Sequence, residues 1–238
     1  MKAALSKAQL ESDIASRFGD AFKLQRARAE KTVVETLSSG VEEIDGLTDG
    51  LPRGAISEIF GPASSGRTSL MYSLLAYATT HEETCALVDT NDVFAPTAAA
   101  VAEMDFDRLL WVRCGGNLEH AFKAADLLLH AGGFGLVILD LGDVPGKEAR
   151  RIISSWWYRF RRTVEDRPTV LTVISEEACT RSCAALALEL NGAAEWSRTS
   201  LKRGVGSLLR HNAIRVNRQR PVTPWITEGQ YSAMALSV

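Results

Sequence analysis

Hydrophobic and polar positions along this chain follow two periods, and the change from one period to the other marks the predicted elements. Short apolar runs are typical of buried strands, and they occur at 56–60, 85–88, 109–112, 136–139 and 169–174. Apolar spacings of three to four residues predict helices at 68–79, 96–104, 118–131 and 147–164. Strands that alternate with helices of this length predict an α/β fold with a mostly parallel sheet and helices on both faces.

The two ends of the chain carry weaker patterns. Apolar residues recur at a spacing near 3.6 over residues 3–30, which predicts an amphipathic helical arm that packs on its own core or on a neighbouring subunit. We therefore divide the chain into an arm at 1–31 and a core domain at 32–238. After Cys179 a short helical segment is predicted, followed by strand patterns at 194–200, 208–217 and 225–227.

Composition and charge narrow the class of protein. The 238 residues, 46% of them hydrophobic, are enough for one sizeable core, and the net charge of −2 predicts no global attraction to nucleic acid. The segment 196–220 is an exception, with seven Lys or Arg and no acid. It could bind nucleic acid weakly and without sequence preference, it could meet an acidic partner, or it could be a solvated face.

Cysteine spacing and hydropathy exclude two further classes. Four cysteines, at 85, 114, 179 and 183, fit no zinc-binding pattern and are expected to be free thiols. No run approaches the roughly 20 apolar residues of a membrane span, and no leader sequence is visible, so a cytoplasmic protein without membrane contact is expected.

The segment ISEIFGPASSGRTSL, residues 56–70, carries the main chemical signal. Gly61, Gly66 and Thr68 match the phosphate-loop pattern G-x-x-x-x-G-K-[ST], but Arg67 takes the lysine position. Backbone N–H groups of such a loop bind phosphate, and the Thr hydroxyl reaches Mg²⁺. An arginine keeps the positive charge, but it is broader and planar. The candidate nucleotide-binding residues of the loop are Gly61, Pro62, Ser64, Ser65, Gly66, Arg67, Thr68 and Ser69.

A second signal is the carboxylate at the end of the aliphatic run 136–139. Asp140 follows this run as the acid of a Walker B strand does, where it holds Mg²⁺, usually through water. Thr68 and Asp140 are therefore the candidate metal ligands, and right-handed crossovers predict that the loop and Asp140 share one edge of the sheet. The predicted helix 147–164 carries Trp156, Trp157, Tyr158 and Phe160 among arginines, which could be core, interface or stacking surface.

These motifs together resemble the core of RecA-type recombinases. The tract ETLSSGVEEIDGLTDGLPRGAISEIFGPASSGRTSL is similar to the start of that core, and the resemblance continues through CALVDTNDVFAP to the last strands near Arg220. It implies a RecA-like P-loop fold with an N-terminal arm, but without the recombinase's C-terminal domain. It also implies that Arg218 and Arg220 lie where the family has two lysines that reach a neighbour's nucleotide.

The departures from the family pattern concern the chemical residues. The glutamate that activates water falls at Asn91, the tyrosine that stacks on adenine falls at Ala98, and the glutamine that senses the γ-phosphate falls near Glu176. The two DNA-binding loops of the family look shortened, at 142–146 and 176–181. An amide cannot accept a proton, so general-base help is largely absent. Binding of ATP and Mg²⁺ is expected to be weak or absent, and no catalytic residue is assigned.

The combination resembles the ImuA group of short RecA-like proteins, some of which are labelled SulA-like. The resemblance implies an accessory role in the bacterial SOS response to DNA damage, in mutagenic translesion synthesis. The implied partners are an ImuB-like inactive Y-family polymerase homologue, an error-prone polymerase and RecA itself, with self-association through the arm. Two alternatives stay open: an active ATP-binding or ATP-hydrolysing DNA-repair protein, and a SulA-like regulator of a polymer-forming partner.

Overall fold

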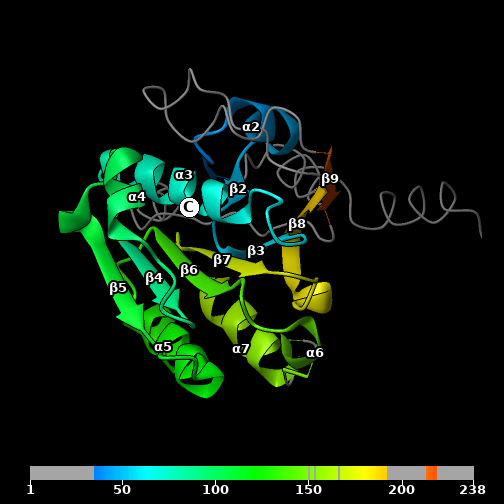
Figure 1. Ribbon diagram of the computed structural model, residues 1–238. Helices are drawn as coiled ribbons and strands as arrows, with labels where there is room; N and C mark the ends of the chain where they lie inside the picture. Colours follow the sequence, from blue (N-terminus) through cyan, green and yellow to red (C-terminus); the bar gives the residue numbers. More distant parts are fainter. Residues whose placement is uncertain (1–34, 150, 153, 166, 192–212, 219–238) are drawn as a thin grey trace, which may run out of the picture. The chain divides into compact units, whose positions relative to one another are not determined.

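Seven strands form the central sheet, in the order β5-β4-β6-β7-β3-β8-β9. The computed structural model describes residues 35–149, 151–152, 154–165, 167–191 and 213–218 (Figure 1). The strands are β3 (Ala55–Phe60), β4 (Cys85–Asp89), β5 (Leu109–Arg113), β6 (Leu136–Leu141), β7 (Val170–Ser175), β8 (Ala184–Asn191) and β9 (Ala213–Arg218). The first six run parallel to their neighbours and β9 pairs antiparallel with β8.

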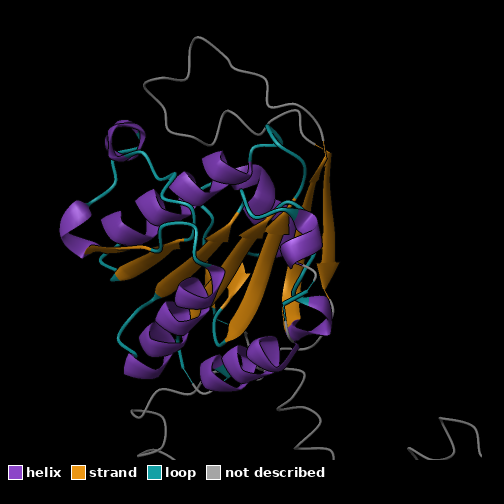
Figure 2. Cartoon of the chain, turned by 60° about the horizontal axis from the view of Figure 1, so that its bottom comes forward, coloured by secondary structure: helices purple, strands orange, loops and turns teal. Residues whose placement is uncertain are grey.

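Helices cover both faces of this sheet (Figure 2). They are α2 (Glu42–Thr48), α3 (Arg67–Thr80), α4 (Pro96–Val101), α5 (Leu118–Ala131), α6 (Gly146–Ala149) and α7 (Ser154–Val164). Two 3₁₀ turns, Phe106–Arg108 and Arg181–Cys183, and a small ribbon of β1 (Thr36–Leu37) with β2 (Leu51–Pro52) complete the described elements. The predicted fold class, a mostly parallel α/β sheet with helices on both faces, is confirmed.

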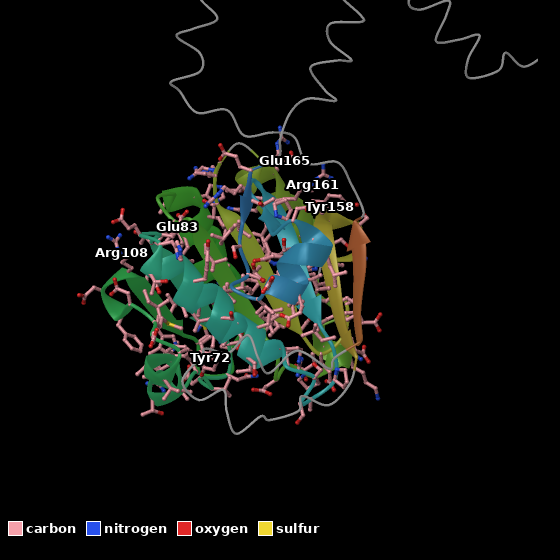
Figure 3. The ribbon with its side chains drawn as sticks, turned by 90° about the horizontal axis from the view of Figure 1, so that it is seen from above. Tyr72, Glu83, Arg108, Tyr158, Arg161 and Glu165 are labelled. Carbon is pink, nitrogen blue, oxygen red and sulfur yellow. The ribbon has the colours of Figure 1, made fainter. Side chains whose placement is uncertain are left out.

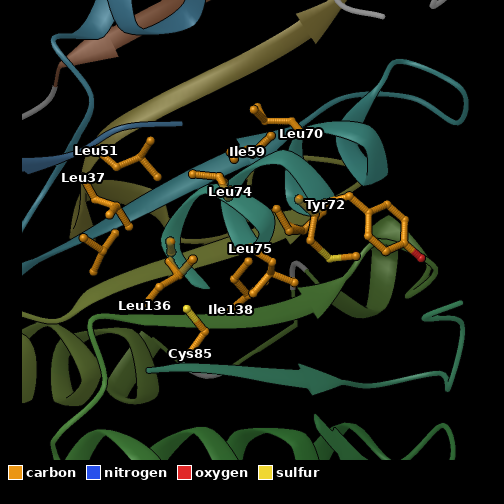
Figure 4. Close-up of a cluster of buried hydrophobic side chains, with 14 of the residues drawn as sticks. Leu37, Leu51, Ile59, Leu70, Tyr72, Leu74, Leu75, Cys85, Leu136 and Ile138 are labelled. Carbon is orange, nitrogen blue, oxygen red and sulfur yellow. The ribbon is translucent and has the colours of Figure 1, made fainter. Parts of the chain in front are cut away.

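Alternation along the strands divides the core into two layers. Leu136 and Ile138 of β6 face the layer under α3, whereas Val137 and Leu139 face the layer under α5 and α7. Figure 4 shows the first layer, where leucines of α3 pack on Ile59 and Ile138. Successive side chains of a strand point to opposite faces, so a central strand that is buried on both faces needs a continuous apolar run.

The second layer is built on aromatic side chains. Trp157 and Phe160 of α7 are fully buried, and Phe122 of α5 packs against both with ring centroids 5.1 and 5.6 Å apart. Trp156 is only half-buried, and Tyr158 is 54% exposed. The sequence left the role of this aromatic run open; the structure makes two of its rings core and leaves the other two accessible.

Two predicted helices have wrong bounds, and one strand was not predicted. The helix predicted at 147–164 is two helices, α6 and α7, with a turn at 151–152. Here the β-branched Ile152 packs into the core, and Ser154 and Ser155 follow, which are poor helix formers. The helix predicted at 96–104 ends at Val101. Residues 184–191, which were assigned to no strand, form β8, because they pair with β3 and β9.

Several predictions lie outside the described residues: the arm at 1–31 and the strands at 194–200 and 225–227. The division into arm and core therefore stays a prediction, and all described residues belong to one compact unit, Val34–Val238. All four cysteines are buried. In the described part of the chain, no helix combines the length and the apolar character that a membrane crossing needs.

Candidate nucleotide site

The phosphate-type loop lies at the C-terminal edge of the sheet, between β3 and α3. In the register of the strands, Ser175 of β7 pairs with Phe60 on one side and with Leu141 on the other. Gly61, Glu176 and the segment after Leu141 therefore leave the sheet at one level. The prediction that the loop and Asp140 share an edge is confirmed, with β7 between their strands.

The loop backbone has the concave form that phosphate binding requires. Ser64 and Gly66 both adopt the left-handed region, with φ of 62° and 98°. Helix α3 begins at Arg67, and its N-cap, Gly66, has no side chain that could cap the first N–H groups of the helix. Such uncapped N–H groups, together with the helix dipole, favour an anion. Pro62, Ser64 and Thr68 are exposed on the loop, Ser69 is half-buried, and Ser65 is buried.

Gly61 is required at its position by a close approach of two backbones. A Cβ at this residue would overlap with the carbonyl oxygen of Leu190 in β8 and would come within 2.8 Å of Ser65 Oγ. The absence of a Cβ at Gly61 thus lets the backbone of β8 lie close to the first residue of the loop.

Arg67 is buried at the start of α3. Its guanidinium is buried, with 9% of the residue exposed, and Nη1 donates a hydrogen bond to the carbonyl oxygen of Gly142 at 3.2 Å. Burial lowers the pKa of Arg67, whereas the nearby carboxylates of Asp140, Glu176 and Asp143 act in the opposite direction. The guanidinium thus already has a hydrogen-bond partner within the protein, and the protein's own carboxylates act on its charge.

Asp140 is buried beside this guanidinium. Its Oδ1 accepts a hydrogen bond from the N–H of Gly142 at 2.8 Å. Burial raises the pKa of Asp140 to about 6, helped by the charges of Asp89 and Asp143 and opposed by the Gly142 N–H and by Arg67. Burial is the dominant cause, since the carboxylate loses its hydration, which disfavours the charged form.

The donor set for Mg²⁺ is small. Thr68 and Asp140 supply two oxygen atoms at this edge, and Mg²⁺ commonly takes one or two protein oxygens together with phosphates and water. Within the described ranges, no three His, Cys, Asp or Glu side chains form a cluster that could hold a metal. The residue types fit a Mg²⁺ ion held mainly by a nucleotide, but the positive charge of Arg67 next to Asp140 opposes one.

Three residues that the resemblance singles out, Asn91, Ala98 and Glu176, flank the same edge. Asn91 follows β4 in a turn that Gly116 holds by donating its N–H to Thr90 O at 2.7 Å. Ala98 is exposed on α4, and Glu176 is exposed directly after β7. Asn91 and Ala98 bring neither a carboxylate nor a ring to this edge.

Sequence reasoning missed one buried charge at the site. Glu58 of β3 is 1% exposed, and its carboxylate accepts hydrogen bonds from Cys179 N at 2.6 Å, Thr180 N at 3.0 Å and Thr180 Oγ1 at 2.6 Å. These bonds join the strand before the phosphate loop to the short segment that begins at Glu176. A glutamate inside an otherwise apolar strand was the available signal.

Of the two C-terminal arginines, Arg218 lies in a strand that the structure describes. Arg218 ends β9, and its backbone pairs with Leu186, at the level of Ser57 rather than of Gly61. Arg220 and most of the basic segment lie outside the described residues. The contact of both arginines with a neighbour's nucleotide stays a prediction.

Comparisons with known proteins agree with this architecture. The family model of the RecA N-terminal domain matches residues 3–148. The chain is 35% identical over 138 residues to Protein RecA of Rickettsia massiliae (strain Mtu5), which covers 58% of this chain and 39% of that protein. It is 37% identical over 133 residues to Protein RecA of Ectopseudomonas oleovorans, which covers 54% of this chain and 37% of that protein. The chain thus spans about two fifths of the length of these relatives, and by its matched residues it belongs to the RecA N-terminal domain family.

Proposed function

We propose that this protein is a RecA-like accessory factor of the bacterial DNA damage response. It supports mutagenic translesion synthesis through contacts with other proteins, and it hydrolyses ATP slowly or not at all. Membership of the RecA N-terminal domain family supports the link to DNA repair. The similarity of the GPASSGRT loop to the ImuA group supports the finer role.

The proposal rests mainly on the burial and the hydrogen bond of Arg67. In a working phosphate loop, the cation at this position contacts the β- and γ-phosphates. Here the guanidinium donates a hydrogen bond to the carbonyl oxygen of Gly142, and the charges of Asp140, Glu176 and Asp143 act on it. Phosphate binding would have to break this hydrogen bond and separate the guanidinium from these charges. With Asn91 in place of a general base, the loss in rate is about 10²- to 10⁴-fold from that residue alone.

The proposed partners follow from the same resemblance. They are an ImuB-like inactive Y-family polymerase homologue, an error-prone polymerase and RecA. Self-association through the arm at 1–31 is part of the proposal, and light scattering at high concentration tests it: a monomeric mass contradicts filaments or rings.

ATP turnover by the purified full chain tests the central claim. The expected rate equals that of the Asp140→Ala variant, with single-stranded DNA absent or present. ATP turnover by the unaltered chain that clearly exceeds the turnover by Asp140→Ala would overturn the proposed accessory role. Affinity purification after DNA damage tests the partners. Recovery of polymerase components supports the proposal, whereas cell-division proteins without any polymerase component favour a SulA-like regulator.

One observation favours a second candidate, an ATP-binding protein that uses the nucleotide as a structural ligand. The left-handed Ser64 and Gly66 and the uncapped start of α3 retain the form of the phosphate cradle. Calorimetry with a non-hydrolysable ATP analogue separates the two candidates. Saturable binding that needs Thr68 would support the second one.

A further inference from the structure

A groove between α5 and α7 remains without a role in the nucleotide site. The two helices lie side by side on one face of the sheet (Figure 1), and Phe122 and Trp156 touch across them with ring centroids 5.7 Å apart. On α5 the side chains facing the groove recur every four residues, at Phe122, Asp126 and His130, which spans about 12 Å along the helix axis. We call this feature the α5–α7 groove.

The groove contains two hollows of different chemistry. The first, of about 390 Å³, is lined mainly by apolar side chains, among them Leu118, Phe122, Ile152 and the half-buried Trp156. The carboxylates of Glu119 and Glu148 and the guanidinium of Arg151 stand at this hollow. Its volume lies in the range of pockets that hold small organic groups. An aromatic wall with nearby hydrogen-bond acceptors suits a flat, nitrogen-rich ring.

The second hollow, of about 410 Å³, is basic. It is lined by His130, Thr163 and three arginines, Arg159, Arg162 and Arg167. Part of this charge has a structural use. Arg167 donates a hydrogen bond to the carbonyl oxygen of His130 at 3.1 Å, near the end of α5, and Arg159 pairs with Asp126 at 2.6 Å.

The structural contacts leave a surplus of donors in the basic hollow. Each guanidinium has five N–H donors, and the contacts of Arg159 and Arg167 use one nitrogen each. Arg162 is exposed and makes no hydrogen bond or ion pair with any described residue. The positive charge therefore exceeds what the ends of α5 and α7 need, and the surplus faces an open hollow.

Arg159 connects the two hollows. Its guanidinium lies 5.8 Å from the centroid of the Trp156 ring and also lines the basic hollow. The groove thus presents an aromatic ring and then a row of arginines along one line. Alternation of a stacking ring with cations is how proteins hold single-stranded nucleic acids without reading their sequence.

We propose that the α5–α7 groove binds a short run of single-stranded nucleic acid, with one unpaired base in the hollow beside Trp156 and the adjacent phosphates on Arg159, Arg162 and Arg167. An acidic peptide fits less well, because Glu148 would repel a carboxylate placed in the first hollow, whereas it can accept a hydrogen bond from the amino group of a base; Glu119 is already paired with Lys123 at 2.7 Å. A duplex offers no base to the first hollow, since its bases are stacked and paired. The inference does not depend on the proposed accessory role.

A matched pair of variants on α7 tests the phosphate contacts. Arg162→Gln removes a charge from the groove, and Arg161→Gln removes the same charge from the neighbouring residue. Arg161 does not line the groove but pairs with Glu165, and Figure 3 shows both with Tyr158 on one side of the protein. Binding of the full chain to a labelled oligothymidylate is followed by fluorescence anisotropy at low salt. We expect Arg162→Gln to weaken binding roughly threefold to fivefold and to lower the salt slope by about one, with Arg161→Gln unchanged.

Trp156→Phe tests the base contact, since it preserves an aromatic ring against Phe122 and Phe160. Quenching of tryptophan fluorescence by the oligonucleotide should fall strongly in this variant. Thermal unfolding checks that all variants remain folded. The proposal is overturned if the unaltered chain does not bind the oligonucleotide, or if Arg162→Gln and Arg161→Gln bind it equally well. It is also overturned if quenching is undiminished in Trp156→Phe, or if duplex DNA or polyglutamate competes as well as the single strand.

Discussion

Replacing Asp140 by asparagine should make the protein more stable at neutral pH. The carboxylate is buried, and its pKa is raised from 3.8 to about 6. Because the folded state binds the proton more tightly than the unfolded state, stability falls as the pH rises from about 4 to about 6, and the full cost of the ionised group is present above pH 6. One pKa unit corresponds to about 1.4 kcal/mol, so the shift amounts to about 3 kcal/mol. Asparagine keeps an acceptor for the N–H of Gly142 and removes the buried charge.

Urea unfolding of both proteins across a pH series measures this difference. At pH 7.5 the free energy of unfolding of Asp140→Asn should exceed that of the unaltered protein by about 3 kcal/mol. The difference should shrink as the pH falls from 6 to 4 and vanish below 4, where the carboxyl is protonated in both states. Asp143→Asn is the control, since Asp143 is exposed and its replacement should change stability by less than about 0.5 kcal/mol. The reasoning is refuted if the free energy of unfolding of Asp140→Asn is not higher at pH 7.5, or if it is higher by the same amount at every pH.

Three further predictions concern the same edge of the sheet. Glu58→Ala leaves three buried donors without an acceptor. In urea titrations it should lower the free energy of unfolding by about 3–5 kcal/mol, and Glu58→Gln should lower it by less. Gly61→Ala should lower the free energy of unfolding by about 1–3 kcal/mol, because the added Cβ overlaps with the carbonyl oxygen of Leu190. Gly46→Ala, in open space on α2, is the control and should raise the free energy of unfolding by up to about 1 kcal/mol. Equal effects of the two substitutions would contradict the packing argument. Arg67→Lys should bind a non-hydrolysable ATP analogue more tightly than the unaltered protein does in calorimetry, because the shorter side chain leaves the loop free for phosphate. Unchanged or weaker binding would contradict the idea that the guanidinium hinders phosphate binding.

Much of the fold could be predicted from the sequence because its signals are local. The runs at 85–88 and 136–139 are apolar without interruption, as strands buried on both faces must be, and both became strands of the central sheet. The spacing of Gly61 and Gly66 predicted a loop followed by a helix, since left-handed backbone and tight backbone packing favour glycine at such positions. Asp140 could be placed at the loop's edge because parallel strands share their carboxyl ends.

Other elements depended on partners far away in the chain. Residues 184–191, AALALELN, are mostly good helix formers, yet they are a strand because β3 offers them backbone hydrogen bonds on one side and β9 on the other. The break before α7 likewise follows from the need to bury Ile152 as well as Trp157 in one layer. Local propensity is worth a few tenths of a kcal/mol per residue, so tertiary pairing and burial override it.

The site shows the same division. By itself the sequence determined the residue types at the loop: an arginine at the lysine position of the pattern, and glycines where the backbone must bend. Only the tertiary structure decided what these residues do. Arg67 meets the carbonyl of Gly142, 75 positions away, and Glu58 meets the N–H of Thr180, 122 positions away. Local patterns encode backbone conformation, whereas the partner of a buried charge depends on which distant segments the sheet brings to one edge.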